Sequence, residues 1–250
     1  MGITIFIAGD NLMYLTKLLS ELKLKIKYPD SKMSTISIEN YIKAIYQSSN
    51  PDAKISTSEM ADKLEVSNAA ISDMAKKLSS SGLISYKKYE GFELTEKGLK
   101  LAMQVVRRHR LWELFLTKVL GLSWSEVHQE AEKLEHHSSD DLVNKIEEYL
   151  DYPTVDPHGD PIPDREGNLP ELPEFKKLIE CQPGVNCKIV RVHDKNTELM
   201  NYLSRIGLTL NKKIRVLQKL SFDNSLIIKA DGSEYTLSEK ISDNIFVVEL

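Results

Sequence analysis

The chain has 250 residues, of which 41% are hydrophobic and 28% are charged. This length and composition suit a soluble protein of two modest domains, and no apolar run approaches the roughly 20 residues of a membrane-spanning helix. The formal net charge of −4 excludes a surface uniformly adapted to nucleic acid, so a DNA-binding surface would have to be local. Cys181 and Cys187 fit neither a Cys-x-x-Cys metal pair nor a secreted disulfide scaffold, and we expect structural thiols in a reducing cytoplasm.

Residues 1–32 are set apart from the segment that follows them. Their apolar start, residues 3–8, is interrupted by Asp10 and leads to no clear cleavage site, so the pattern does not favour a signal peptide. A second methionine, Met33, precedes a segment with the pattern of a self-contained domain. We interpret residues 1–32 as an N-terminal extension of unknown role. A misplaced start codon and a short docking helix both remain open.

Residues 33–98 have the pattern of a winged helix-turn-helix. Apolar residues recur at three- and four-residue spacing over residues 38–46, which predicts an amphipathic helix that stops before Pro51. A short helix is expected after Ser56, and a turn at residues 65–68 leads into a third helix. Two short helices joined by a tight turn are typical of a helix-turn-helix. Strands at residues 83–86 and 92–95 then predict a hairpin, the wing.

Positive charge is concentrated in this part of the chain. Residues 34–110 hold 12 Lys and Arg against 9 Asp and Glu, a net charge of +3. A recognition helix contacts base edges with its N-terminal residues, whereas basic side chains meet the phosphates. The candidate base contacts are Ser67, Ala69, Ala70 and Asp73, and the candidate phosphate contacts are Lys76, Lys77, Lys87 and Lys88. The alternative is that these lysines are only a solvated face.

The rest of the chain divides into a helical part, a linker and a β part. Helices are expected at about residues 96–119, 125–137 and 139–149, and residues 99–150 form a helical domain. Residues 151–174 contain six prolines, which predicts a linker on the surface. Short β-rich runs at residues 187–192, 214–220, 226–229 and 245–250 surround a helix at residues 198–205 and predict a small barrel-like β domain in residues 175–250. The expected fold class is mainly α, with a β-hairpin wing and a small C-terminal β domain.

Histidines and glutamates are crowded into the helical part. They are His109, His128, His136 and His137, interleaved with Glu113, Glu130, Glu132 and Glu135. His109 and Glu113 are four residues apart, which places them on one helix face, and His128 and Glu132 repeat this spacing on the next helix. Because the donors are imidazole and carboxylate with no thiolate nearby, Mn(II) or Fe(II) fits better than structural zinc. The alternative is a solvated, acidic helix pair that is rich in histidine.

These segments together resemble the diphtheria toxin repressor family, which includes iron-dependent repressors and the manganese transport regulator. The resemblance covers about residues 34–250, and its markers are residues 39–46 (ENYIKAIY), 94–98 (LTEKG), 108–111 (RHRL), 127–131 (VHQEA), 135–136 (EH) and 157–163 (PHGDPIP). It implies a metal-activated repressor that binds double-stranded operator DNA as a homodimer. It also implies two metal sites per subunit, a helical domain for dimerisation and metal binding, and an SH3-like (FeoA-like) C-terminal domain.

Carried over by position, the resemblance implies two sets of ligands. The primary site would use Asn40, Glu132, Glu135 and His136, and the ancillary site would use His109, Glu113 and His128, with Asp194 as a further candidate. Glu132 stands where iron-type members have Cys, which resembles the manganese-responsive branch. Asn40 stands where that branch carries Asp, and Lys43 where some members carry another carboxylate. The metal is expected to join the first helix to the helix that bears Glu132, which would fix the winged helix in its DNA-competent orientation.

Two functions of other classes are alternatives. A metallohydrolase could use His and Glu on helices, but the sequence has no His-Glu-x-x-His motif and no separate nucleophile, so we expect no enzymatic activity. A winged-helix regulator of a small organic ligand would bind DNA without metal. His158 is expected either as a simple turn residue or in a packing role, and the apolar faces of residues 111–122 and 142–150 are expected at a dimer seam. The preferred prediction is a cytoplasmic, metal-dependent repressor that controls metal-ion homeostasis.

Overall fold

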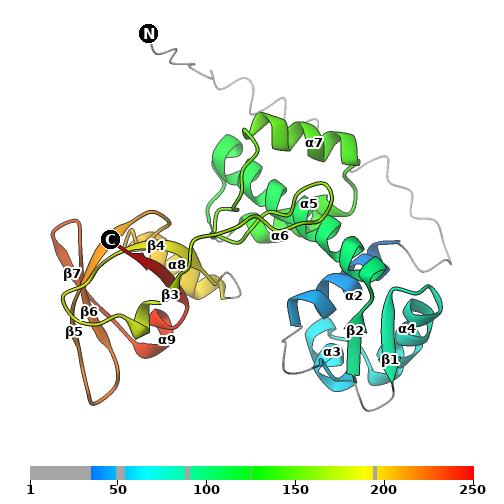
Figure 1. Cartoon of the computed structure of the whole chain (residues 1–250), viewed down its shortest axis with the longest axis horizontal. Coiled ribbons are helices and arrows are strands. Elements are labelled where there is room, and N and C mark those ends of the chain that lie inside the picture. Colours follow the sequence, from blue (N-terminus) through cyan, green and yellow to red (C-terminus); the bar gives the residue numbers. More distant parts are fainter. Residues whose placement is uncertain (1–34, 49–53, 88–90, 125, 194–195) are drawn as a thin grey trace, which may run out of the picture. The chain divides into compact units, whose positions relative to one another are not determined.

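The computed structural model describes residues 35–48, 54–87, 91–124, 126–193 and 196–250 (Figure 1). Residues 1–32, Lys88 and Asp194, for which the sequence raised possible roles, lie outside the described residues. The helices are α2 (Thr35–Ser48), α3 (Thr57–Leu64), α4 (Asn68–Ser80), α5 (Glu96–Leu120), α6 (Val127–Glu135), α7 (Asp140–Tyr149), the 3-10 helix η1 (Leu178–Glu180), α8 (Thr197–Arg205) and α9 (Glu239–Ser242). The strands are β1 (Ile84–Lys87), β2 (Gly91–Leu94), β3 (Lys176–Lys177), β4 (Asn186–Val192), β5 (Lys213–Lys219), β6 (Leu226–Ala230), β7 (Ser233–Leu237) and β8 (Ile245–Glu249). None of the described helices is long and apolar enough to cross a membrane.

Helices α2, α3 and α4 pack around a common core, and the β1–β2 hairpin follows them. The core side chains include Ile42, Ile45, Met60, Ile71 and Leu78, which lie at helical spacing and are fully or almost fully buried. The Ser56 hydroxyl accepts a hydrogen bond from the Glu59 backbone N–H and the Glu59 carboxylate accepts from the Ser56 N–H, so a capping box begins α3. Two helices, a tight turn and an antiparallel hairpin therefore lie where the sequence predicts them.

The first turn of α5 packs against the hairpin. The Thr95 hydroxyl accepts a hydrogen bond from the Gly98 N–H and so caps the helix. A Cβ atom on Gly98 would lie 1.9 Å from the Leu83 carbonyl oxygen, so only glycine lets the two backbones approach. These contacts explain why Thr95 and Gly98 occur in the segment LTEKG: one caps the helix and the other permits the close backbone contact.

Helices α6 and α7 pack on α5, the long helix at the centre of the helical part (Figure 1). Leu111 and Leu114 of α5 are buried against Val143 and Ile146 of α7 within the chain. These four side chains therefore pack within the chain, and the dimer seam expected along residues 111–122 and 142–150 stays a prediction. On α7 the exposed apolar side chains are Leu142 and Tyr149.

Helix α6 begins two residues later than expected, because the Glu126 carboxylate accepts hydrogen bonds from the Ser123 N–H and hydroxyl and holds that stretch in a turn.

Four consecutive basic residues of α5 each face an acidic partner from a different segment. The pairs are Arg107 with Glu147 of α7 (2.8 Å), Arg108 with Glu39 of α2 (2.6 Å), His109 with Glu135 of α6 (2.5 Å) and Arg110 with Asp156 of the linker (3.6 Å). Successive residues of a helix point about 100° apart, so one short segment can reach four neighbours. We call residues 107–110 the basic quartet.

The C-terminal part is a six-stranded antiparallel sheet in the order β3-β8-β4-β5-β6-β7, with α8 packed on its core. The expected strands and the helix at residues 198–205 are present, and β3, β7 and α9 were not predicted. Both β3 and β7 are edge strands: β3 consists of two half-buried lysines, and β7 has three exposed polar residues beside half-buried Tyr235 and buried Leu237, so neither carries a clear apolar run. Cys181 and Cys187 are buried free thiols whose sulfur atoms lie 3.7 Å apart.

The proline-rich linker packs on β4 through a glycine turn. Gly159 has φ +90°, and a Cβ atom there would lie 2.1 Å from the Val190 carbonyl oxygen. Beside it, the Val192 N–H donates to the His158 carbonyl (2.8 Å). The His158 side chain is almost fully buried and stacks on Trp124 at 5.3 Å between ring centroids, so of the two alternatives the packing role is the one observed.

Candidate metal centre

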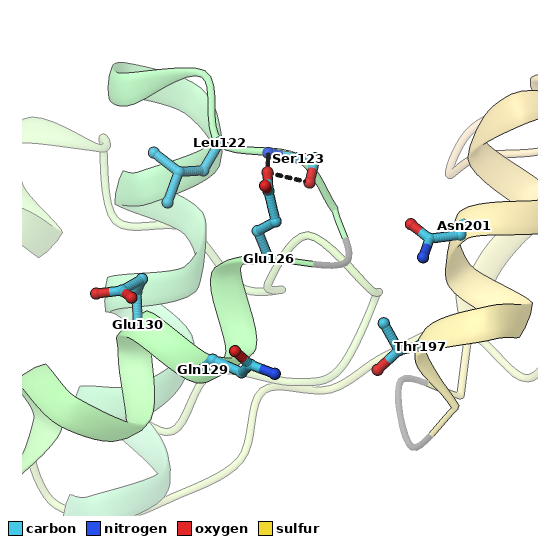
Figure 2. Close-up of a pocket in the computed structure, with 7 residues that line it drawn as sticks. All are labelled: Leu122, Ser123, Glu126, Gln129, Glu130, Thr197 and Asn201. Atoms are coloured by element: carbon cyan, nitrogen blue, oxygen red, sulfur yellow. Dashed lines mark hydrogen bonds between the residues drawn. The ribbon is translucent and has the colours of Figure 1, made fainter.

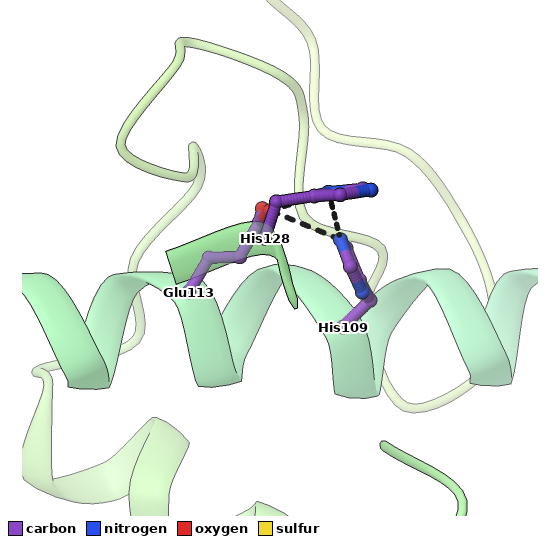
Figure 3. A group of neighbouring side chains, drawn as sticks. All are labelled: His109, Glu113 and His128. Atoms are coloured by element: carbon purple, nitrogen blue, oxygen red, sulfur yellow. Dashed lines mark hydrogen bonds and ion pairs between the residues drawn. The ribbon is translucent and has the colours of Figure 1, made fainter. Parts of the chain in front are cut away.

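The first cluster of possible metal ligands joins α5 to α6. His109 and Glu113 extend from the same side of α5, and His128 of α6 reaches toward them (Figure 3). Glu113 Oε1 lies 3.0 Å from His109 Nε2 and 3.1 Å from His128 Nδ1, and the two imidazoles are 3.1 Å apart at these nitrogens. Glu113 is fully buried, whereas the His128 side chain is 45% exposed. The ancillary set expected from the sequence is therefore brought together, with a path to solvent at His128.

The second cluster uses the other nitrogen of His109. His109 Nδ1 lies 2.5 Å from Glu135 Oε2 and 3.9 Å from Glu132 Oε1. His109, Glu132 and Glu135 offer donor atoms within 4.8 Å of one another. Glu132 and Glu135 were assigned to the primary site from the sequence, but the His109 side chain lies between both clusters and belongs to neither alone.

Lys43 of α2 enters the second cluster. Its Nζ atom lies 2.7 Å from Glu132 Oε1 and 2.8 Å from Glu135 Oε2. The same Nζ atom is 3.1 Å from His109 Nδ1. The sequence did not predict this contact, because Lys43 and Glu132 are 89 residues apart and come together only when α2 and α6 both pack on α5.

The remaining primary candidates, Asn40 and His136, are placed differently. His136 Nδ1 lies 2.6 Å from Glu39 Oε2, and His136 Nε2 lies 3.2 Å from Glu135 Oε1. Glu39, which the sequence did not single out, also pairs with Arg108. Asn40 Oδ1 is buried and has no hydrogen-bond partner among the residues that the structure describes.

The charges of these groups depend on one another. Burial alone would lower the pKa of His109, but the charge of Glu113 and hydrogen bonds with Glu113 and Glu135 outweigh it and raise the pKa to about 9. Burial would raise the pKa of Glu113, but His109 and His128 hold it well below its usual range. His109 Nε2 faces Glu113 and His109 Nδ1 faces Glu135. The charge of Lys43, whose Nζ atom lies 3.1 Å from His109 Nδ1, acts in the opposite direction and lowers the pKa of His109.

The residues present fit a divalent cation. The donors are imidazole nitrogens and carboxylate oxygens, which suit Mn(II) and Fe(II). Two buried oxygen atoms, Asn40 Oδ1 and Glu113 Oε2, have no hydrogen-bond partner within the described residues, and leaving such atoms without a partner is costly unless a ligand meets them. Asp194, the further ancillary candidate, lies outside the described residues.

The candidate DNA-contacting residues lie on α4 and the hairpin. Ser67 caps α4 through a hydrogen bond from the Ala70 N–H (3.2 Å), and Ala69, Ala70 and Asp73 are exposed on its first turns. Lys76 and Lys77 are exposed further along the helix, and Lys76 pairs with Asp73 at 3.2 Å. Lys87 ends β1.

A pocket of about 710 Å³ lies outside both histidine clusters (Figure 2). It is lined by Leu122, Ser123, Glu126, Gln129, Glu130, Thr197 and Asn201. Leu122 is the only apolar residue in this lining, whereas pockets for organic ligands are lined mainly by apolar and aromatic side chains. The pocket therefore gives little support to a small organic effector.

Three family models match consecutive parts of the chain. They are described as the N-terminal DNA-binding domain of iron-dependent repressors (residues 33–92), the metal-binding and dimerisation domain of iron-dependent repressors (residues 95–164) and the FeoA domain (residues 176–249). The diphtheria toxin repressor of Corynebacterium glutamicum is 34% identical over 218 residues, which cover 84% of this chain and 94% of that protein. The chain belongs to the diphtheria toxin repressor family. The resemblance found in the sequence is thereby confirmed.

Other members of the diphtheria toxin repressor family show the same relationship. The iron-dependent repressor IdeR of Mycobacterium tuberculosis is 37% identical over 125 residues, or 50% of this chain, and the chain spans about half of that relative (54%). A solved structure described as a manganese-dependent transcriptional repressor in complex with manganese has a TM-score of 0.78 and 35% identity, and it covers 85% of this chain and 100% of its own.

Proposed function

We propose that this protein is a metal-dependent transcriptional repressor that responds to Mn(II) or Fe(II) and controls metal-ion homeostasis in the cytoplasm. One observation carries the proposal: donor atoms from α5 and α6 converge in two clusters that share His109, and α2 contributes Lys43 to one of them. In this proposal a homodimer binds double-stranded operator DNA, and the protein is not an enzyme. The names of the relatives, which are iron- and manganese-dependent repressors, support it.

The proposed primary ligands are Glu132, Glu135, His136 and Asn40. A bound ion would supply a divalent positive charge among these donors. Glu135 is fully buried and Glu132 half-buried, so α6 presents one anchored and one accessible carboxylate. Asn40 lies on α2, whose apolar face forms part of the core shared with α3 and α4. Ligands on both α2 and α6 would therefore restrict how the helix-turn-helix sits on the helical part.

The proposed ancillary ligands are His109, Glu113 and His128, with Asp194 as a further candidate. Glu113 is positioned by contacts with both imidazoles, so the three side chains are already in place. Across the two sets, residues that offer oxygen outnumber the three histidines, and no thiolate belongs to either set, which favours Mn(II) over a structural zinc ion.

The proposed DNA interface is the exposed side of α4 together with the hairpin as a wing. Ser67, Ala69, Ala70 and Asp73 would face base edges, and Lys76, Lys77, Lys87 and Lys88 would meet phosphates. The proposed domains are a winged helix at residues 33–98, a helical dimerisation and metal-binding domain at 99–150, a linker at 151–174 and an SH3-like domain at 175–250. Residues 1–32 remain an extension of unknown role.

The test is a fluorescence-anisotropy titration of the protein onto its own upstream DNA with Mn(II), anaerobic Fe(II), Zn(II) or chelator. We expect Mn(II) or Fe(II) to tighten binding, and we expect Glu132→Ala to lose this response while its fold is retained, because Glu132 is half-exposed. Glu130→Ala is the matched control, since Glu130 lies on the same helix and pairs with Lys133 outside the clusters. Equal DNA binding with metal and with chelator would contradict the proposal, and an unchanged response in Glu132→Ala would contradict the ligand assignment.

A further inference from the structure

The ammonium group of Lys43 lies among atoms that would hold the metal. It is within hydrogen-bond distance of Glu132 Oε1 (2.7 Å) and of both Glu135 oxygens (3.0 and 2.8 Å). The Lys43 side chain is 5% exposed. Its aliphatic stem therefore passes through the interior from α2, and its ammonium group lies among three carboxylate oxygens.

The buried charges of Lys43 and Glu135 neutralise each other. A buried ammonium or carboxylate without a partner is strongly disfavoured, and here the fully buried Glu135 and the buried Lys43 compensate each other. Lysine suits this task because its ammonium is a compact point charge on a flexible stem, with three donors for several oxygens. In the metal-free protein, Lys43 is thus the resident cation of the primary donor set.

A divalent ion and this ammonium compete for the same oxygen atoms. The lone pairs of Glu132 Oε1 and of the Glu135 carboxylate are directed at Nζ, and two cations held by the same carboxylates would repel each other at close range. His109 Nδ1, a further possible donor, is also only 3.1 Å from Nζ. An ion could reach this donor set only after the ammonium moves away.

We propose that Lys43 is a built-in competitor for the primary metal site: its ammonium occupies the donor set in the metal-free protein, and its displacement sets the metal concentration at which the site fills. The inference rests on the proposed function and names a regulatory element of that site. Lys43 lies three residues after Asn40 on α2, so the displaced cation and a proposed ligand belong to neighbouring turns of one helix. The exchange of ammonium for metal therefore takes place on the helix that leads into the helix-turn-helix.

The decisive variant is Lys43→Met, which keeps an unbranched apolar stem and removes the charge. Lys133→Met is its matched control: Lys133 lies on α6 between Glu132 and Glu135 in sequence, but its side chain is 64% exposed and pairs with Glu130. Two quantities are measured for each protein: the melting temperature without metal, and the Mn(II) dissociation constant by competition with a metal-binding dye.

We expect opposite changes in Lys43→Met. The metal-free melting temperature should fall by about 5 °C or more, because two carboxylates lose their buried counter-charge. Mn(II) binding should become at least about tenfold tighter, because charge-assisted hydrogen bonds no longer have to be broken. Lys133→Met should change neither. A lysine with only a structural role would weaken both stability and metal binding, so unchanged or weaker Mn(II) binding in Lys43→Met overturns the inference.

A second variant and the chemical accessibility of the Lys43 amine test the same inference. Should Lys43→Met not fold, Lys43→Gln is measured with the same two outcomes. In the wild-type protein, acylation of the Lys43 amine, scored by mass spectrometry against Lys133, should rise when Mn(II) is added; unchanged protection of Lys43 overturns the inference.

The metal-dependent DNA titration separates this inference from the proposed function. If Mn(II) binds the wild-type protein and tightens its DNA binding, but Lys43→Met binds Mn(II) no more tightly, only the competitor role fails. If neither protein binds Mn(II) or Fe(II), both fail. If Lys43→Met binds and the wild-type protein does not, the ammonium blocks the site outright and the competitor role is supported.

Discussion

At the scale of single residues, the clearest departure from the usual behaviour of a residue type is the burial of two glutamates. Glu113 and Glu135 are fully buried and serve several partners each, whereas Glu130 and Glu126 on the same stretch are surface groups. The chemistry of the metal centre thus depends on which carboxylates are enclosed, and sequence spacing alone does not show this.

The two cysteine thiols provide a test at this scale. Burial, reinforced by Cys181, raises the pKa of Cys187 to about 12, and burial also raises the pKa of Cys181. At pH 8 the native protein should react slowly with an aromatic disulfide reagent, because the thiolate is the nucleophile, and both thiols should react once the protein is denatured. Fast reaction of the native protein at pH 8 would show that the thiols are not enclosed as described.

The same shift predicts how stability depends on pH. The folded-state pKa of Cys187 lies above the value of about 8.5 in an unfolded chain. Below about pH 8.5, the stabilisation that comes from keeping this thiol protonated is therefore fully present in the free energy of unfolding. The contribution is lost as pH rises from about 8.5 toward 12. Between pH 8 and 10 the free energy of unfolding should fall less in Cys187→Ala than in the wild-type protein.

At the scale of elements, the proline-rich linker is fixed to β4 by a close backbone approach and an ion pair. Gly159 combines a positive φ with a close approach to β4, and Asp160 beside it pairs with Arg191 at 2.6 Å. The linker is therefore a packed element and not a loose tether.

Gly159→Ala tests this packing. We expect it to lower the free energy of unfolding by more than about 2 kcal/mol, because both the strained backbone and the clash with Val190 contribute. Gly184→Ala is the control: Gly184 has φ +94°, and a Cβ atom there would meet nothing within 4 Å beyond its chain neighbours, so only the backbone cost of about 1 kcal/mol remains. Equal losses in the two variants, measured by urea unfolding, would show that the linker does not press on β4.

Helix boundaries were predictable from the sequence because capping residues and apolar spacing are local signals. Ser56, Ser67, Thr95 and Ser139 each cap the helix that was expected after them. The edge strands β3 and β7 were missed because β3 has only two residues and β7 has only two apolar side chains, which is too little for a periodic signal. In the metal centre, the pairs within one helix were predictable from four-residue spacing. The contacts of Lys43, Glu39 and His158 were not, because they depend on how separate elements pack.

At the scale of the whole molecule, the exposed apolar residues of α7 are candidates for the surface between two copies. The inner face of α7 is used by Val143 and Ile146, while Leu142 and Tyr149 are 46% and 69% exposed. Contiguous exposed apolar surface is a mark of protein–protein interfaces, and the two side chains are predicted to form part of one.

The double variant Leu142→Glu/Tyr149→Glu should therefore convert a dimer into a monomer, because charges would be buried without partners in the interface. Light scattering after size-exclusion chromatography measures the mass. The control is Phe222→Glu, since Phe222 is 82% exposed but lies in the C-terminal part, between β5 and β6. A dimer that survives the double variant, or dissociates with Phe222→Glu, would place the interface elsewhere.

The basic quartet of α5 has a consequence for how this family member can change over evolutionary time. Inserting or deleting one residue of α5 before Arg107 would rotate all four side chains by about 100° about the helix axis. Each side chain would then point away from its own acidic partner and toward the partner of an adjacent residue. Substitutions at these positions can be compensated one pair at a time, whereas a change in length would disrupt every pair at once. The length of α5 up to residue 107 is therefore constrained more strictly than its amino-acid identity.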